Sequence, residues 1–306
     1  MSARSDVPVM IEVAVNGATR RDRSPHVPIT PAEIAGDAIA CIDAGASIVH
    51  IHTTDQGLPM VVRAERYAES LRAMRAARPT AVLYPTMGGG ADISARYDHH
   101  VLLADEGVID MGVLDPGSVN LSATAPDGMP QKSGHVYVNS PADIAHMMSV
   151  CREEGIGPSF AIYEPGFLRT VIAYHRAGML AAGSLTKFYF SGSGYFSGGY
   201  PLFSAPPIPE AFELYYAMLG EGAPELPWGV AILGGNILAT PIARLALERG
   251  GHLRVGLEDD PSGPPNTEQV QKAVALCAEV GRPVASPERA REILGLPSRP
   301  RVTRAE

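Results

Sequence analysis

Ser47-Ile48-Val49-His50-Ile51-His52 is the stretch of this chain that decides the fold. Its first residues are largely β-branched, which is the composition of a buried strand. Because successive side chains of a strand alternate between its two faces, His50 and His52 point one way and Ile51 points into the packing behind. Two imidazoles on one face predict a binding site for a divalent metal at the end of this strand.

The same unit, a short β-rich run followed by a longer amphipathic run, repeats about eight times along the chain. The expected strands are 9–15, 47–51, 81–84, 108–113, 160–163, 187–190, 229–233 and 253–257. The expected helices are 31–44, 63–78, 93–104, 141–154, 168–177, 209–219, 241–248 and 267–280, with Thr30 and Ser140 as caps. Such alternation favours an α/β fold of the TIM (β/α)8 barrel type over an open doubly wound sheet. The first strand lacks a Gly-x-Gly-x-x-Gly fingerprint, which argues against a Rossmann fold.

The size and charge of the chain narrow the class of protein. Its 306 residues are 45% apolar, enough for one large core, so we expect residues 1–306 to form a single domain. The net charge is −8 and the 25 basic residues are scattered, which argues against a nucleic acid or an anionic membrane as partner. The expected partners are therefore small molecules.

The cysteines and the amino terminus indicate the cellular compartment in which the protein is expected. Cys41, Cys151 and Cys277 fall in helix-like segments at no metal-ligand spacing, which is typical of buried packing in a reducing environment. The first residues lack an apolar signal region, and no run reaches the roughly 18 apolar residues that a membrane span needs. We therefore expect a cytoplasmic protein.

Polar residues gather where the expected strands end, which is where a barrel builds its active site. These residues are Thr86 and the glycines at 88–90, then Asp115, Ser118, Asn120 and Glu164, and finally Glu258 and Asp259. The first and last strands of a closed barrel are neighbours, so only one strand separates the second from the eighth. Glu258 is thus expected to join His50 and His52 in a metal site with an open position. Arg254 and Asp259 beside it form either a catalytic pair or an ion pair that braces the barrel mouth.

Three further segments have open interpretations. The glycines at 88–90 form either a simple turn or a cradle of backbone N–H groups for an anion. His99 and His100 lie in a polar, helix-like stretch, and we expect them on the solvated surface. The Ser- and Gly-rich segment 191–199 is too long for a minimal turn, so it is either a lid or ligand loop, or low complexity without function.

Short motifs over nearly the whole chain carry a resemblance to a known family. They are Val13-Ala14-Val15-Asn16-Gly17-Ala18, Pro28-Ile29-Thr30-Pro31-Ala32-Glu33-Ile34, Ala44-Gly45-Ala46 before the histidine strand, Gly117-Ser118-Val119-Asn120, Trp228-Gly229-Val230, and Arg254-Val255-Gly256-Leu257-Glu258-Asp259. With these motifs the chain resembles the β-keto acid cleavage enzyme family, whose founding activity is 3-keto-5-aminohexanoate cleavage. The segment from Arg254 to Asp259 is the most specific piece.

The resemblance implies a zinc-dependent TIM barrel in which a β-keto acid and acetyl-CoA give acetoacetate and a new acyl-CoA. It implies Zn²⁺ held by His50, His52 and Glu258, where the ion polarises the keto oxygen and acidifies the adjacent methylene. Asp259 matches the family's base, and Arg254 orients it. Thr86, Ser118 and Asn120 match positions that hold the substrate. Family members are commonly tetramers, so a homotetramer is expected by resemblance.

The chain also departs from the family's pattern. Thr53-Thr54-Asp55 follows the histidines where the family usually has an Arg-Asp pair, and Thr19 or its neighbour stands where the founding enzyme has a glutamate. The fifth strand has Pro158-Ser159-Phe160-Ala161 in place of Pro-Glu-x-Glu. We therefore predict a substrate with a neutral or apolar side chain in place of an amino group. Residues 122–134 resemble an insertion at the barrel mouth.

The main alternative is a metal-dependent hydrolase of the amidohydrolase kind, which also uses His-x-His at the end of a barrel strand. Such enzymes need further histidines on the fifth and sixth strands, and the expected strands 160–163 and 187–190 have none. A third interpretation, a structural metal or a ligand-binding barrel without catalysis, fits best with a closed coordination shell.

Overall fold

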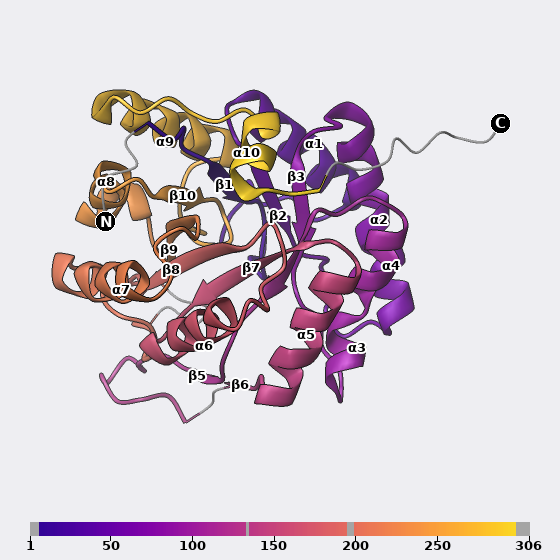
Figure 1. The fold of residues 1–306 in the computed structure, drawn as a ribbon, viewed down its shortest axis with the longest axis horizontal. Coiled ribbons are helices and arrows are strands. Elements are labelled where there is room, and N and C mark those ends of the chain that lie inside the picture. The colour runs from indigo at the N-terminus through magenta and orange to yellow at the C-terminus, as the bar shows by residue number, and fades with distance from the viewer. Residues whose placement is uncertain (1–5, 133–134, 195–198, 298–306) are drawn as a thin grey trace.

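The computed structural model describes residues 6–132, 135–194 and 199–297. Within them, eight parallel strands form a nearly closed barrel surrounded by helices, which confirms the TIM-barrel prediction (Figure 1). The strand order is β3-β2-β1-β10-β9-β8-β7-β4. Their bounds are β1 Ile11–Ala14, β2 Ile48–Ile51, β3 Val82–Pro85, β4 Met111–Leu114, β7 Gly157–Ile162, β8 Leu185–Ser191, β9 Trp228–Leu233 and β10 His252–Val255.

The helices follow the strands in the expected alternation. They are α1 Pro31–Asp43, α2 Met60–Ala77, α3 Ile93–Tyr97, α4 His99–Asp105, α5 Pro141–Glu153, α6 Pro165–Arg176, α7 Pro209–Gly222, α8 Pro241–Glu248, α9 Asn266–Val280 and α10 Pro287–Leu294, with a short 3-10 turn η1 Ile237–Ala239. Thr30 and Ser140 cap α1 and α5 through capping boxes, as predicted. The sequence analysis did not predict α10.

Closure of the barrel rests on Asp110, where β3 and β4 meet. The backbone N–H of Asp110 donates to the carbonyl of Leu83 at 2.8 Å, and its carboxylate accepts from the N–H of Leu83 at 2.9 Å. Arg75 and Arg291 both pair with this buried carboxylate, so its charge is neutralised. The backbone and the side chain of Asp110 thus each make one hydrogen bond between the two edge strands, in place of a regular ladder.

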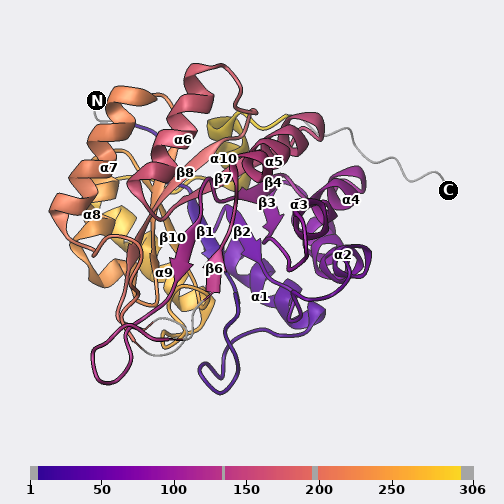
Figure 2. The same ribbon diagram turned by 90° about the horizontal axis from the view of Figure 1, so that it is seen from below.

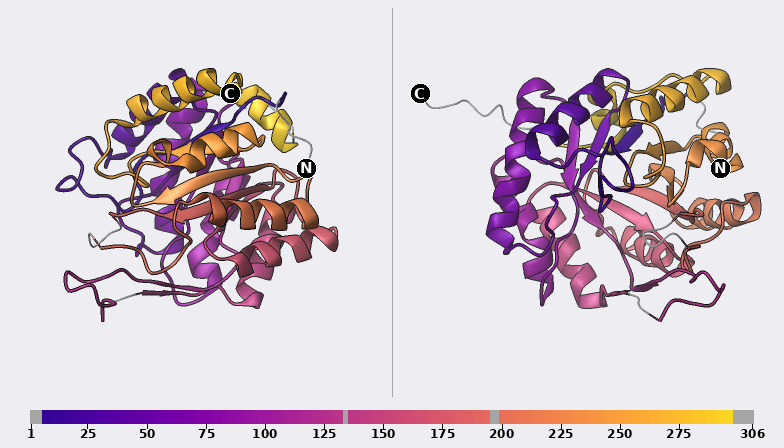
Figure 3. Two further views of the ribbon diagram at one scale, coloured as in Figure 1. Left: turned by 90° about the vertical axis from the view of Figure 1, so that its left-hand side faces the viewer. Right: turned by 180° about the vertical axis from the view of Figure 1, so that it is seen from behind.

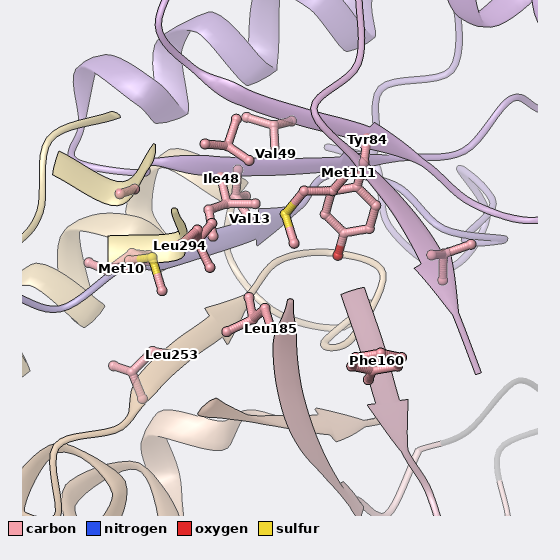
Figure 4. Close-up of a cluster of buried hydrophobic side chains, with 14 of the residues drawn as sticks. Met10, Val13, Ile48, Val49, Tyr84, Met111, Phe160, Leu185, Leu253 and Leu294 are labelled. Atoms are coloured by element: carbon pink, nitrogen blue, oxygen red, sulfur yellow. The ribbon is translucent and has the colours of Figure 1, made fainter. Parts of the chain in front are cut away.

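The inside of the barrel is apolar at its floor and polar above. Met10, Ile48 and Leu185 are at most 2% exposed and belong to one core cluster (Figure 4). Each such buried side chain contributes about 1.5–3 kcal/mol of stabilisation. The next inward positions are charged, because Glu12, Lys187 and Arg254 border the same small cavity as these apolar residues.

The expected helix 93–104 is two helices, and this changes the environment of two histidines. The helix is interrupted at Asp98, which ends α3 and precedes α4. His99 and His100 are both fully buried, so the prediction of a solvated surface is wrong. His99 stacks on Tyr67, and His100 stacks on Tyr97. The break turns both rings toward the barrel, and flat aromatic neighbours cover them.

The segment after β4 forms a short antiparallel hairpin of β5 Val119–Leu121 and β6 His135–Tyr137. The predicted insertion 122–134 is the connection of this hairpin, although 133–134 lie outside the described residues, as do 195–198 of the segment 191–199. Figures 2 and 3 show that this connection and the loop between β1 and α1 both project from the side where the barrel strands end. In the described ranges, no helix is long and apolar enough to cross a membrane.

Candidate metal centre and active site

The carboxyl end of β2 presents two histidines to the inside of the barrel. His50 pairs in register with Ala14 of β1 and Tyr84 of β3. Asn16 fixes the backbone of His52, because its side chain donates to the carbonyl of His52 at 2.9 Å and accepts from the N–H at 2.9 Å. The strand alternation and this two-sided bond together set the direction of both imidazoles.

A tight turn after β10 brings a carboxylate to the same place. Gly256 has φ of +136°, and a Cβ there would lie 2.2 Å from the carbonyl oxygen of Ala14. The carbonyl of Gly256 accepts from the N–H groups of Asp259 and Asp260, which closes the turn. Only glycine fits this backbone, so the turn returns Glu258 and Asp259 to the barrel mouth.

Gly17 makes the matching space on the β1 side. It has φ of +55°, and a Cβ there would lie 2.4 Å from Cγ of Glu258. The Asn16-Gly17 pair therefore serves both ligands, since Asn16 holds His52 and Gly17 lets Glu258 approach. This explains physically why the motif around Asn16 belongs to the site.

The three side chains have the spacing of a metal site. The Nε2 atoms of His50 and His52 are 3.2 Å apart, and the carboxylate of Glu258 lies 3.4 Å from the first and 3.3 Å from the second. Ligands held about 2.0–2.1 Å from Zn²⁺ at tetrahedral angles are about 3.3 Å apart. Among the described residues, this is the group of three or more such side chains that could hold a metal ion. The donors therefore fit a tetrahedral ion with one position left open.

The ionisation states of His50 and Glu258 suit metal ligands. Burial lowers the pKa of His50 well below its ordinary value, so the ring is neutral at pH 7 and offers a lone pair. Burial alone would raise the pKa of Glu258, but His52 and Arg254 hold it well below its usual range. One oxygen of Glu258 and Nδ1 of His50 are buried without a hydrogen-bond partner among the described residues.

Arg254 pairs with the carboxylates of Asp259 and Glu258 beside these donors. Its Nε and Nη2 donate to the two oxygens of Asp259 at 2.9 and 3.1 Å, and Nη2 also lies 2.9 Å from Glu258. Asp259 is 1% exposed, and burial raises its pKa to about 6 against the lowering effect of Arg254. The predicted base is therefore ionised at neutral pH, fixed in direction and adjacent to the metal ligands.

A buried polar network that the sequence analysis missed supports Arg254 from below. Glu12 accepts from Nη1 of Arg254 at 2.8 Å, from Nζ of Lys187 at 2.8 and 3.1 Å, and from the hydroxyl of Tyr84 at 2.5 Å. Ser159 donates to that hydroxyl at 3.2 Å. Burial alone would raise the pKa of Glu12, but Lys187 and Arg254 lower it to about 2. A charged residue inside an apolar barrel strand was the available signal, because such a residue must find a partner.

The charges of this cluster favour a bound cation. Three carboxylates, those of Glu12, Glu258 and Asp259, face the two cations of Arg254 and Lys187, all at most 15% exposed on the side chain. One net negative charge remains in a region of low dielectric, which is costly unless a cation offsets it. A divalent ion at the three donors would supply that charge.

The hydrogen bonds described for the predicted substrate-binding residues join them to groups other than the candidate metal ligands. The hydroxyl of Ser118 accepts from the N–H of Asn139 at 2.9 Å and donates to its carbonyl at 3.1 Å, which ties the hairpin at its base. Asn120 is an exposed residue of β5. Thr86 is half-buried, and its carbonyl is 2.9 Å from Nε2 of His99. Their role in substrate binding stays a prediction.

Asp115, at the end of β4, is a second buried acid near the mouth. The hydroxyl of Tyr137 in β6 donates to its Oδ2 at 2.6 Å, while Oδ1 has no hydrogen-bond partner among the described residues. Burial raises the pKa of Asp115 to about 6, with Lys187, Arg254 and Glu258 among the charges that act on it. Asp115 therefore belongs to the electrostatic surroundings of the metal ligands.

The glycines at 88–90 have a structural explanation. The guanidinium of buried Arg63 packs against Gly88 and donates to the carbonyls of Gln56, Leu58, Gly89 and Ala95. The N–H groups of Gly88 and Gly89 already donate to carbonyls. The glycines therefore leave room for Arg63, and the N–H groups of Gly88 and Gly89 are already hydrogen-bonded within the protein.

The fold and the site together define a TIM-barrel protein with a cluster of two histidines and a carboxylate at the strand ends that could hold a metal ion. The model of the beta-keto acid cleavage enzyme family matches residues 8–296, and the chain belongs to this family. The chain is 30% identical to the 3-keto-5-aminohexanoate cleavage enzyme of Acetoanaerobium sticklandii, over 94% of this chain and 98% of that one.

A second relative agrees with this assignment, and a solved structure agrees with the fold. The 3-oxoadipate:acetyl-CoA acetyltransferase of Cupriavidus necator is 29% identical, over 95% of this chain and 96% of that one. The apo structure of ObcA superposes with a TM-score of 0.68 at 18% identity, covering 89% of this chain and 66% of ObcA. The ObcA likeness supports the barrel fold alone.

Proposed function

We propose that this chain is a divalent-metal-dependent acyltransferase that condenses a β-keto acid with acetyl-CoA and releases acetoacetate and a new acyl-CoA. The observation that carries the proposal is the position of Asp259, held by both nitrogens of one edge of Arg254, next to three donors with tetrahedral spacing. The relatives named above differ in the side chain of the keto acid, which suggests a shared reaction with a variable substrate.

His50, His52 and Glu258 would hold the metal, which we propose is zinc because neutral imidazoles and one carboxylate are ligands typical of catalytic zinc. A bound divalent ion would supply a Lewis acid for the keto oxygen of the substrate. Asp259 would take a proton from the methylene between the keto group and the carboxylate. Arg254 keeps both oxygens of Asp259 in a fixed plane, so the base needs no reorientation before the transfer.

The resulting carbanion would attack the thioester carbonyl of acetyl-CoA and expel the CoA thiolate. The thiolate would then add to the original keto carbonyl, and cleavage of the bond between that carbon and the former methylene carbon would give the new acyl-CoA and the carbanion of acetoacetate. Protonated Asp259 would return its proton to that carbanion. Once Asp259 holds the proton, the two positive charges of Lys187 and Arg254 face only the carboxylates of Glu12 and Glu258, so the cluster no longer carries a net negative charge beside the carbanion. Tyr84 and Glu12 hold Lys187 by hydrogen bonds, so this field is fixed before substrate binds. The buried network would thus stabilise the anionic stage of the reaction.

A neutral or apolar side chain on the keto acid remains our preferred substrate. The walls at the carboxyl ends of β7, β8 and β9 include Ala161, Tyr189 and Ala231, which form a small buried apolar cluster. Ser159 is engaged with Tyr84 and carries no charge. An ammonium group would lose its hydration here without gaining an acid from β7.

The hydrolase alternative has no support at the strands where it needs ligands. β7 and β8 contain no histidine, and the inward position of β8 is Lys187, which is paired with Glu12. The family match places the chain with the cleavage enzymes. Hydrolysis of an amide at this centre is therefore not proposed.

The test is formation of acetoacetate from acetyl-CoA and a panel of β-keto acids with neutral, acidic and amino side chains. We expect turnover with a neutral member and loss of about 10²–10⁴-fold in kcat in Asp259→Asn, the range for removal of a general base. No acetoacetate with any member would refute the function. Preference for the amino compound would refute only the substrate class and would direct attention to Asp115, whose Oδ1 is unpartnered among the described residues.

A further inference from the structure

A cavity of about 360 Å³ lies beside the metal ligands but outside the ring of strands. The segment before α1, the end of β2 with the loop after it, and the first half of α2 form its walls, and α1 packs on α2 in this region (Figure 1). Ile51 is a wall residue, and it points away from the barrel axis because it alternates with His50 and His52 along β2. His52 is a wall residue too, so the cavity reaches the metal site at one of its ligands.

The walls combine apolar surface with a few polar groups. Ile34, Leu58 and Val62 contribute aliphatic surface, and exposed Thr54 contributes a hydroxyl. The volume lies within the roughly 300–1,000 Å³ that is usual for ligand pockets. Val62 is 39% exposed at the cavity, so an apolar side chain faces the solvent there without cover from the protein.

We propose that this cavity binds the pantetheine arm of the acyl-CoA substrate, an inference that rests on the function proposed above. The two substrates must approach one another from different sides, because the keto acid has to reach both the metal ligands and Asp259 inside the barrel. Beneath those groups the interior is filled by Glu12, Tyr84 and Lys187, all fully or nearly fully buried. A long donor therefore enters over the rim, and His52, which borders this cavity and also belongs to the three-donor cluster, marks where its thioester end meets the reacting carbon.

The chemistry of the arm matches the walls. Pantetheine alternates a gem-dimethyl group and methylenes with two amides, which suits aliphatic walls bordered by polar residues such as Thr54. Arg66 borders the same cavity, and its side chain is 56% exposed. Its ion pair with Glu69, at 3.3 Å, lies on the surface and is therefore weak. An exposed guanidinium at this position suits the phosphates at the far end of the donor.

The decisive variant is Val62→Trp, which fills the cavity from an exposed helix position, with Val61→Trp as its control. Val61 is the adjacent residue of α2, is 54% exposed and is not a wall residue. In the metal-loaded enzyme we expect Val62→Trp to raise the KM for acetyl-CoA at least roughly tenfold, while the KM for the keto acid stays within about twofold. Val61→Trp should match wild type. Equal KM values for acetyl-CoA in both variants, or an increase for the keto acid in place of acetyl-CoA, would overturn the assignment.

Direct binding separates this inference from the proposed function. Desulfo-CoA binding is measured by calorimetry without keto acid, and we expect Val62→Trp to weaken it about as much as it raises the KM. Weakened binding in a chain that forms no acetoacetate would refute the function and keep the site. Turnover with unchanged desulfo-CoA binding in Val62→Trp would refute the site and keep the function.

A truncated donor tests the position of Arg66. Arg66→Glu should raise the KM for acetyl-CoA several-fold and leave the KM for acetyl-pantetheine, which lacks the nucleotide, unchanged. An equal effect on both donors would contradict the placement of the phosphates at Arg66.

Discussion

The described residues include two histidine pairs close to the core, one at the end of β2 and one at the start of α4, and of these two the first has the surroundings of a metal site. His50 and His52 are two residues apart on a strand and point the same way toward Glu258. His99 and His100 are adjacent, and their ring nitrogens bond to the carbonyls of Thr86 and Tyr97. Burial lowers the pKa of His50, His99 and His100 alike.

The difference teaches that burial of an imidazole does not make it a ligand. A metal site needs converging lone pairs and a negative charge, which Glu258 supplies at β2 and which α4 lacks in its immediate contacts, since nearby Asp98 pairs with His146. At α4 the backbone carbonyls accept hydrogen bonds from the ring N–H groups, and the rings of Tyr67 and Tyr97 stack on the two imidazoles. The first pair is expected to act in chemistry and the second in stability.

Replacing one histidine from each pair gives the largest contrast. His50→Gln removes a donor with tetrahedral spacing, and we expect loss of the metal and of roughly three orders of magnitude in kcat/KM, equivalent to several kcal/mol. His100→Gln, the matched control, should keep the metal. Elemental analysis and the acetoacetate assay measure both. A His50→Gln protein with wild-type metal content would remove the distinction between the pairs.

Glu12 tests whether the buried charges near the first pair act as a unit. Removing one partner of a buried ion pair costs about 3–5 kcal/mol, so Glu12→Gln should lower the unfolding free energy by that amount. The double variant Glu12→Gln, Lys187→Met should be less destabilised than the sum of the single variants, because no unpaired ammonium remains. Denaturant unfolding measures all four proteins. Strictly additive losses would show that Glu12 and Lys187 do not share an interaction.

The second pair, His99 and His100, should make the unfolding free energy depend on pH in the acid range. The pKa of His100 is lowered by burial from 6.5 to about 4, so between these values the unfolded chain binds more protons than the folded one. The unfolding free energy should therefore decrease as the pH falls through this window, by roughly 3 kcal/mol from this group. His100→Gln should show a shallower pH dependence than wild type. Parallel curves for the two proteins would assign the acid sensitivity elsewhere.

Gly17 gives the smallest but most local test. Gly17→Ala and Gly281→Ala both place a Cβ on a residue with positive φ, at a cost of about 1–2 kcal/mol each. At Gly17 the Cβ would also lie 2.4 Å from Cγ of Glu258, whereas at Gly281 no atom lies within 4 Å. We expect similar melting temperatures but reduced metal content only in Gly17→Ala. Full metal content in both would mean that Glu258 does not need this space.

Much of the fold could be predicted because the strand and helix periods were regular and the caps Thr30 and Ser140 were conventional. The failures lie where tertiary contacts overrode local pattern. Asp98 breaks the expected helix 93–104, and nothing in the local sequence indicated that the barrel would cover His99 and His100. The short hairpin β5–β6 depends on a long-range tie between Ser118 and Asn139.

The candidate site was predictable on one side of the barrel only. His50, His52, Arg254, Glu258 and Asp259 lie in two short motifs. The spacing within these motifs predicted the cluster of His50, His52 and Glu258, whereas the roles of Arg254 and Asp259 came from the family resemblance. Glu12 and Lys187 are 175 residues apart and meet only through the closure of the barrel. Each is a single charge in an apolar strand, and the partner of such a residue cannot be read from its neighbours in sequence.

The central claim is that His50, His52 and Glu258 hold a metal on which the transfer reaction depends. Its most direct test measures metal per chain and acetoacetate formation on the same samples of wild type and Glu258→Gln. We predict about one divalent ion per wild-type chain, with both the ion and the activity lost in the variant. A metal-free wild type that still forms acetoacetate, or a variant that retains both, would contradict the account.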